Sequence, residues 1–123
     1  KNENKETSDL GWEIYPDGIY HILKDLWKYK KPIYITENGI ADARDAHRAK
    51  FIADHLRWIH RAIQEGIDAR GYFYWSLLDN FEWDKGFWPR FGLVEIDYQT
   101  MERKIRPSAQ EYAKICKNNE LIM

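Results

Sequence analysis

The sequence is poor in cysteine and has no long hydrophobic run. Because the chain has only one cysteine, Cys116, an internal disulfide and a metal site built from cysteines are excluded. We expect Cys116 to be a small packing residue on the last helix. No apolar run approaches the roughly 20 residues of a membrane span. No secretory signal is visible, and because the first residue is Lys1 rather than Met we expect a processed end or a cut within a longer chain. The cellular location stays open, with the cytoplasm favoured.

Neither sign of charge dominates the chain. The 19 basic and 20 acidic residues give a net charge of -1, so neither a nucleic acid nor an acidic membrane is an expected partner. We interpret all four histidines as surface or packing residues of helices, with His55 on an apolar stripe; they are His21, His47, His55 and His60. We therefore expect no metal and no other cofactor.

Aromatic residues are plentiful, at 15% of the chain, with six tryptophans and eight tyrosines. Large aromatic rings must pack or meet a ligand. Flat apolar rings beside polar groups suit sugars, whose rings have apolar faces and hydroxyl rims. Composition alone does not separate a sugar site from an aromatic-rich core.

Apolar periodicity predicts helices that alternate with strands. Residues 1–9 are polar and aperiodic, so we expect a loop or a disordered end there. The predicted elements are a helix from Pro16 to about Lys30, a strand at 33–36, a helix from about Asp45 to Gln64, a strand at 71–75, a short strand or extended segment at 91–97, and a helix from Pro107 to about Lys117.

Strands that alternate with helices pair in parallel through right-handed crossovers. Two such strands are too few for a complete sheet, so the chain looks cut from something larger. A (β/α)₈ barrel is the natural candidate for this α/β chain, since its active residues follow its strands. Polar residues do follow both predicted strands: Thr36, Glu37 and Asn38 after the first, and Ser76, Asp79 and Asn80 after the second.

Glu37 alone could be a nucleophile, a proton-transfer group or merely a solvated strand end. Two longer motifs extend the pattern: Tyr-Ile-Thr-Glu-Asn-Gly at 34–39 and Trp-Ser-Leu-Leu-Asp-Asn-Phe-Glu-Trp at 75–83. Together with Gly-Trp-Glu-Ile-Tyr-Pro-Asp-Gly at 11–18 and Arg-Phe-Gly at 90–92, they resemble glycoside hydrolase family 1, the retaining β-glycosidases. The resemblance implies that the whole chain, 1–123, is the C-terminal segment of one barrel, around its seventh and eighth strands.

The resemblance also implies roles for individual residues. Glu37 matches the catalytic nucleophile, and Glu82 matches the carboxylate that binds sugar hydroxyls, typically at positions 4 and 6. Trp75 matches the tryptophan that stacks under the glycone ring, the sugar on the non-reducing side of the bond. Trp83 matches the tryptophan whose indole N–H reaches another hydroxyl.

Two further matches are looser. Phe91 matches a wall residue near the hydroxymethyl end of the sugar, and Trp12 matches an aromatic platform for the aglycone. We expect Asp79 and Asn80 to shape the loop through backbone hydrogen bonds rather than to catalyse.

One part of the family pattern is missing. The general acid/base Glu of this family lies in an Asn-Glu-Pro motif, which does not occur in this chain. We therefore expect the segment to be inactive alone and to need the remaining N-terminal part of the barrel, or self-association. A non-catalytic carbohydrate-binding or structural part-barrel is the alternative. Because Glu82 would repel a 6-phosphate and Lys85 is the only basic residue between it and Arg90, we expect a neutral glycone in β-glucosidase-like chemistry.

Overall fold

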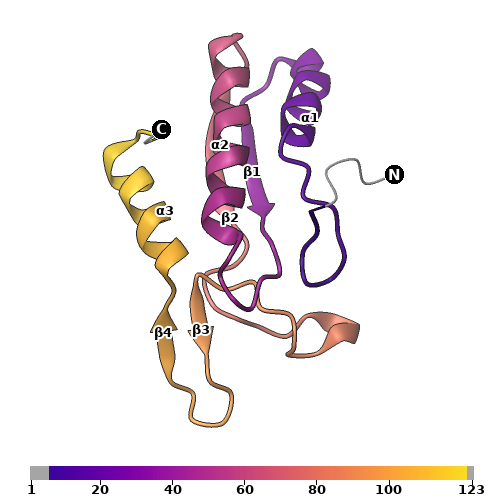
Figure 1. The fold of residues 1–123 in the computed structure, drawn as a ribbon. Coiled ribbons are helices and arrows are strands. Elements are labelled where there is room, and N and C mark those ends of the chain that lie inside the picture. Colours follow the sequence, from indigo (N-terminus) through magenta and orange to yellow (C-terminus); the bar gives the residue numbers. More distant parts are fainter. Residues whose placement is uncertain (1–5, 122–123) are drawn as a thin grey trace.

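The structure, a computed structural model, describes residues 6–121 (Figure 1). Residues 1–5, part of the predicted loop at 1–9, lie outside the described residues. The elements in chain order are α1 (Gly18–Leu26), the 3-10 turn η1 (Trp27–Tyr29), β1 (Ile33–Asn38), α2 (Arg48–Gln64), β2 (Ala69–Tyr74), the 3-10 turn η2 (Trp83–Lys85), β3 (Val94–Ile96), β4 (Arg103–Ile105) and α3 (Pro107–Asn118).

β1 and β2 pair in parallel, as the alternation of strands and helices predicted. The register joins Ile33 to Ala69 at one end and Asn38 to Tyr74 at the other. α2 connects the two strands, and Figure 1 shows it between α1 and α3. The carboxyl ends of β1 and β2 therefore lie side by side, and the residues that follow both strands start from the same end of the sheet.

Two buried apolar clusters hold the helices against the sheet. One cluster joins α1 to α2 and consists of Tyr20, Leu23, Ile59, Ala62 and Ile67. Ile33 and Ile35 pack on it from alternate positions of β1, so one face of that strand is covered by helices. The second cluster lies nearer the strand ends and consists of Ile14, Ile40, Phe51, Ile52 and Leu93.

The opposite face of the sheet is open. Tyr34 on β1 is 54% exposed and Phe73 on β2 is 59% exposed. Gly71 lies between them, and a Cβ there would come within 2.7 Å of the Tyr34 ring. An aromatic sheet face of this kind is expected to be covered by other residues in a stable protein, because parallel sheets are normally buried on both faces.

The start of α2 differs from the prediction. We expected the helix from about Asp45, but Asp45 has a positive φ of 56° and the helix begins at Arg48. The Asp42 carboxylate accepts the N–H groups of His47, at 2.7 Å, and of Arg48, at 3.1 Å. Asp42 therefore satisfies the first free donors of the helix from a position six residues upstream, which no local pattern indicates.

The C-terminal region holds two further differences. β3 and β4 form an antiparallel hairpin, and we did not predict β4 because three exposed residues give no periodicity. Cys116 does lie on the last helix, α3, but it is exposed, so its predicted packing role is wrong. Among residues 6–121, no helix combines the length and the apolar character that crossing a membrane requires.

Arg48 joins the start of α2 to the strand ends. Its side chain is fully buried; it donates to the Tyr74 hydroxyl at 3.0 Å and to the Asp42 carbonyl at 2.6 Å, and it forms an ion pair with Asp45. It also donates to the Arg90 carbonyl at 2.8 Å, which ties the loop after β2 to the same guanidinium. Because Arg48 is buried, loss of these partners would leave an uncompensated charge in the interior, which is strongly destabilising.

We expect the isolated chain not to persist as a folded monomer, because its aromatic sheet face and free strand edges drive association. Sedimentation should show self-association, aggregates or a complex with the complementary part of the protein. A monodisperse 14.8 kDa monomer with slowly exchanging amides in both β1 and β2 would contradict this expectation.

Removing the Arg48 side chain should destabilise the intact protein, because its carboxylate and carbonyl partners would lose their donors. Arg48→Ala should lower the free energy of unfolding by about 3–5 kcal/mol. Arg57→Ala is the matched control on the same helix, since the Arg57–Asp54 pair is partly exposed and should contribute less than about 1 kcal/mol. Equal losses for both variants in denaturant titrations would show that Arg48 is not a structural hub.

Candidate active site

Glu37 and Trp75 stand at the adjoining ends of β1 and β2. The Trp75 N–H donates to the Asn38 carbonyl at 2.9 Å. The Asn38 side chain accepts the Tyr72 hydroxyl at 2.8 Å. The pairing of β1 with β2 is irregular between Ile35 and Asn38, and Thr36 and Glu37 are both exposed there. Trp75 is 39% exposed. An exposed carboxylate and a partly exposed indole ring therefore lie at the carboxyl ends of two paired strands.

Gly39 allows the end of β1 to lie close to the Trp75 backbone at the end of β2. A Cβ at Gly39 would lie 1.7 Å from the Trp75 carbonyl oxygen, which no side chain could tolerate. The glycine of the Thr-Glu-Asn-Gly motif is thus required by the contact between the two strand ends. The following residue, Ile40, enters the buried core at 2% exposure, so the chain turns away from the site at once.

Glu82 and Trp83 lie on the loop after β2, as the sequence predicted. The Glu82 N–H donates to the Gly86 carbonyl at 2.7 Å, which closes a tight turn around η2. Trp83 is 81% exposed and has a positive φ of 46°, an uncommon conformation for a bulky residue. The rings of Phe81 and Phe87, on either side of this turn in the sequence, contact each other with centroids 5.2 Å apart and planes tilted by 60°. The turn holds Glu82 half-buried and presents the Trp83 ring to solvent.

Asp79 closes the base of that loop and does not face the open side. Its side chain is fully buried and accepts the Gly92 N–H at 2.8 Å and two guanidinium N–H groups of Arg106, at 3.0 and 3.1 Å. Burial alone would raise the pKa of Asp79, but these hydrogen bonds outweigh it and hold the pKa below its ordinary value. The predicted loop-shaping role of Asp79 is confirmed, whereas its partner Arg106 was not foreseen.

Trp12 and Phe91 meet beside the strand ends. Their ring centroids are 6.2 Å apart and tilted by 48°. Trp12 is 56% exposed, and its segment is tied down where the Asp9 N–H donates to the Ala41 carbonyl at 2.9 Å. Phe91 is 4% exposed, so it offers little surface to a ligand in this segment. Its carbonyl accepts the Ser76 N–H at 3.3 Å, which places it next to the end of β2.

No metal site accompanies these residues in the part of the chain that the structure describes, where no group of three or more His, Cys, Asp or Glu side chains gathers. His55 is buried and its Nδ1 lies 2.7 Å from the Phe51 carbonyl. Burial lowers the pKa of His55. The other three histidines are exposed, in agreement with the prediction for them.

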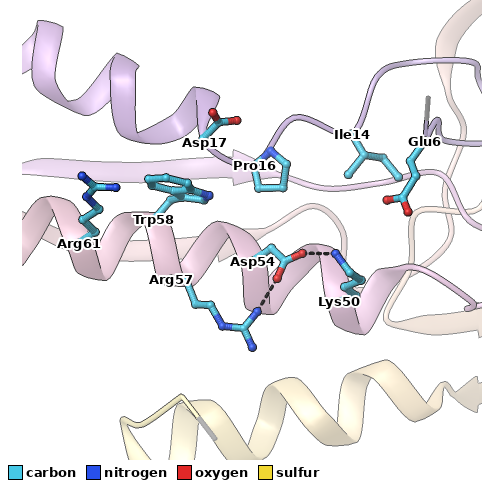
Figure 2. Close-up of a pocket in the computed structure, with 9 residues that line it drawn as sticks. All are labelled: Glu6, Ile14, Pro16, Asp17, Lys50, Asp54, Arg57, Trp58 and Arg61. Carbon is cyan, nitrogen blue, oxygen red and sulfur yellow. Dashed lines mark hydrogen bonds and ion pairs between the residues drawn. The ribbon is translucent and has the colours of Figure 1, made fainter. Parts of the chain in front are cut away.

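One groove of this segment lies away from the predicted site, and a smaller hollow touches its edge. A groove of about 610 Å³ runs between α2 and the segment that leads into α1, and Figure 2 shows its lining of charged side chains around Trp58. None of the predicted site residues lines it. A smaller hollow of about 190 Å³ includes Trp12, Asn38 and Gly39 at the edge of the site. Glu37 and Trp75 thus lie on an open surface whose remaining walls this segment does not supply.

Comparison with known proteins identifies the family of this chain. Residues 1–121 match the profile of glycosyl hydrolase family 1. A beta-galactosidase of Sulfolobus acidocaldarius is 48% identical over 117 residues, which are 94% of this chain and 24% of the relative. Beta-glucosidase A of Thermotoga maritima is 46% identical over 91% of this chain and 28% of its own length.

Solved structures give the same picture. The beta-glycosidase from Pyrococcus horikoshii superposes with a TM-score of 0.94 at 52% identity, over 97% of this chain and 28% of that one. The beta-glycosidase from Thermosphaera aggregans superposes with a TM-score of 0.91 at 44% identity, over 94% of this chain and 24% of that one. The chain spans about a quarter of the length of the curated relatives described above. By its sequence motifs, its fold and these matches, the chain belongs to glycosyl hydrolase family 1.

Proposed function

We propose that the complete protein hydrolyses β-glycosidic bonds with retention of configuration, with Glu37 as the nucleophile. The observation that supports this most is the parallel pairing of β1 with β2, which brings the exposed Glu37 and Trp75 to the same carboxyl end of the sheet. Active residues of (β/α)₈ barrels lie at the carboxyl ends of strands. In this proposal β1 and β2 are the seventh and eighth strands of such a barrel.

The chemistry follows from a carboxylate beside a bound sugar. The Glu37 carboxylate attacks the anomeric carbon while an acid protonates the leaving oxygen, which gives a covalent glycosyl-enzyme. Water then attacks the same carbon with help from the conjugate base. The second carboxyl group must lie about 5–5.5 Å from the first. Because the chain has no Asn-Glu-Pro motif, we assign the acid/base to the remaining part of the protein.

The sugar contacts come from the strand ends and the loop. Trp75 offers a ring for stacking under the glycone, and Glu82 accepts hydrogen bonds from its hydroxyls. The indole N–H of Trp83 donates to another hydroxyl. The edge of Phe91 borders the hydroxymethyl end, and the exposed ring of Trp12 supports the aglycone.

The proposed glycone is a neutral hexose. Relatives bear the names beta-galactosidase and beta-glucosidase A, which favour a galacto- or gluco-configured sugar. Lys85 is engaged by Asp84 at 2.8 Å, and the carboxylate of Glu82 would repel a sugar phosphate. Nothing in this loop therefore favours a 6-phosphate.

A non-catalytic part-barrel is the second candidate, because the segment covers about a quarter of its relatives and lacks the acid/base motif. In that case the exposed sheet face would be covered by further copies of the chain. The mass of the native species separates the two candidates. A complex that contains the complementary barrel portion favours the enzyme, and a homo-oligomer of this chain favours the part-barrel.

The nucleophile can be identified by trapping. A 2-deoxy-2-fluoro β-glycoside should form a stable ester with Glu37 in the intact protein, because the fluorine slows hydrolysis of the intermediate. Peptide mass spectrometry should locate the label on Glu37, and Glu37→Gln should abolish it. Glu95→Gln, at an exposed carboxylate on β3, should be labelled like the wild type. A label on any other carboxylate would overturn the assignment.

Glu82 should govern recognition of the glycone. Glu82→Ser would leave sugar hydroxyls without a hydrogen-bond acceptor. Because a buried polar group without a partner costs roughly 1–3 kcal/mol, kcat/KM should fall about 10- to 100-fold. Asp84→Ser is the control in the same loop, because the Asp84 side chain is 79% exposed and its loss should leave kcat/KM within about twofold. An unchanged kcat/KM in Glu82→Ser would place Glu82 outside the pocket.

A further inference from the structure

The loop that carries Glu82 and Trp83 leaves and rejoins the structure through one buried ionic cluster. We call this cluster the loop clamp, and it consists of the side chains of Asp79, Arg90 and Arg106 with the backbone of Gly92. Asp79 precedes the loop and Gly92 follows it. Both ends of the loop are thus held by the same carboxylate.

The Asp79 carboxylate uses both oxygens in the clamp. Oδ1 accepts the Gly92 N–H at 2.8 Å and Nη1 of Arg106 at 3.0 Å. Oδ2 accepts Nη2 of Arg106 at 3.1 Å and Nη1 of Arg90 at 3.3 Å. It also accepts the Ile96 N–H at 3.3 Å, so β3 is tied to the same group.

Arg106 completes the clamp from the far side of the β3–β4 hairpin. Its Nη1 donates to the Gly92 carbonyl at 2.7 Å, and its side chain is 4% exposed. Gly92 admits this packing because a Cβ there would lie 2.3 Å from the Asp79 nitrogen. The guanidinium, the carboxylate and the Gly92 peptide therefore form one close-packed unit.

The contacts within the loop do not fix its placement. The hydrogen bonds among Glu82, Trp83 and Gly86 close the tip upon itself. The rings of Phe87 and Tyr98 contact each other with centroids 4.7 Å apart and planes tilted by 59°, and the Arg90 guanidinium lies 4.6 Å from the Tyr98 ring centroid. These ring contacts connect the tip of the loop, residues 82–86, to Arg90 of the clamp. The hydrogen bonds within the tip maintain its shape. The position of the tip relative to Trp75 depends on the base of the loop, where the clamp holds Asp79 and Gly92.

We propose that Asp79 and Arg106 are positioning residues for glycone selectivity, which hold the carboxylate of Glu82 at its place in the sugar pocket. This inference rests on the proposed function. Neither side chain reaches the open side of the sheet, so both act through the loop. Only Asn80 and Phe81 separate Asp79 from Glu82, so a small displacement at the base of the loop moves the Glu82 carboxylate away from a sugar hydroxyl.

The test compares two substrates in the intact protein, an aryl β-glucoside and its 6-deoxy analogue, well below the unfolding temperature. Asp79→Asn removes the charge that Arg106 neutralises, and Arg106→Lys keeps the charge but loses the two-point contact. In both variants the ratio of kcat/KM for the glucoside to that for the analogue should fall about tenfold, because the hydroxyl contact is lost. Glu82→Ser should lower the same ratio, and adding Asp79→Asn to it should lower the ratio no further.

A merely structural role predicts a different result. Ile59→Ala opens a cavity in the α1–α2 cluster, away from the loop, and should lower thermal stability while the ratio stays at the wild-type value. If Asp79→Asn and Arg106→Lys slow both substrates equally, or if their effect adds fully to that of Glu82→Ser, the positioning role is wrong. A wild-type protein that cleaves neither substrate overturns the proposed function itself, and the inference with it.

Discussion

The parallel pairing of β1 with β2 is the constraint on which the rest of this segment depends. It brings two strand ends to one edge and makes α2 the crossover between them. Helices cover one face of the pair, while Tyr34 and Phe73 are exposed on the other. This open face exposes apolar surface, and Glu37 lies at its carboxyl end. The chain spans about a quarter of the length of its relatives, and we propose that the rest of the complete protein covers this face.

Buried arginines hold the irregular segments at the strand ends. Arg48 ties the start of α2 to the loop near Arg90, and Arg106 ties the hairpin to Asp79. Backbone groups in such loops have no ladder partners, so side chains must satisfy them. Guanidinium groups suit this task because one side chain offers several donors in fixed geometry. The shape of the candidate site thus depends on charges that never face a ligand.

The sequence predicted the parts whose signals are local. Short apolar runs located both strands of the parallel pair, and helical periodicity located all three helices. The strand-end rule singled out Glu37, whereas Trp75 was assigned through the family resemblance. Glu82 and Trp83 required the family resemblance, because a loop has no periodicity that selects them. Arg106 was missed because its pairing with Asp79 spans 27 residues, and no local pattern encodes so distant a contact. The start of α2 was misplaced for a similar reason, since its first N–H groups are satisfied by Asp42.

The central claim is that the open sheet face is an interior surface of the complete protein. Thiol labelling of Phe73→Cys in the intact protein tests it directly, with His60→Cys on the exposed side of α2 as the reference and labelled peptides identified by mass. We expect the cysteine at position 73 to resist maleimide until the protein is unfolded, and the cysteine at position 60 to react at once. Equal reaction rates at both positions in the native protein would show that this face is solvent-exposed and that the segment is not enclosed by a barrel.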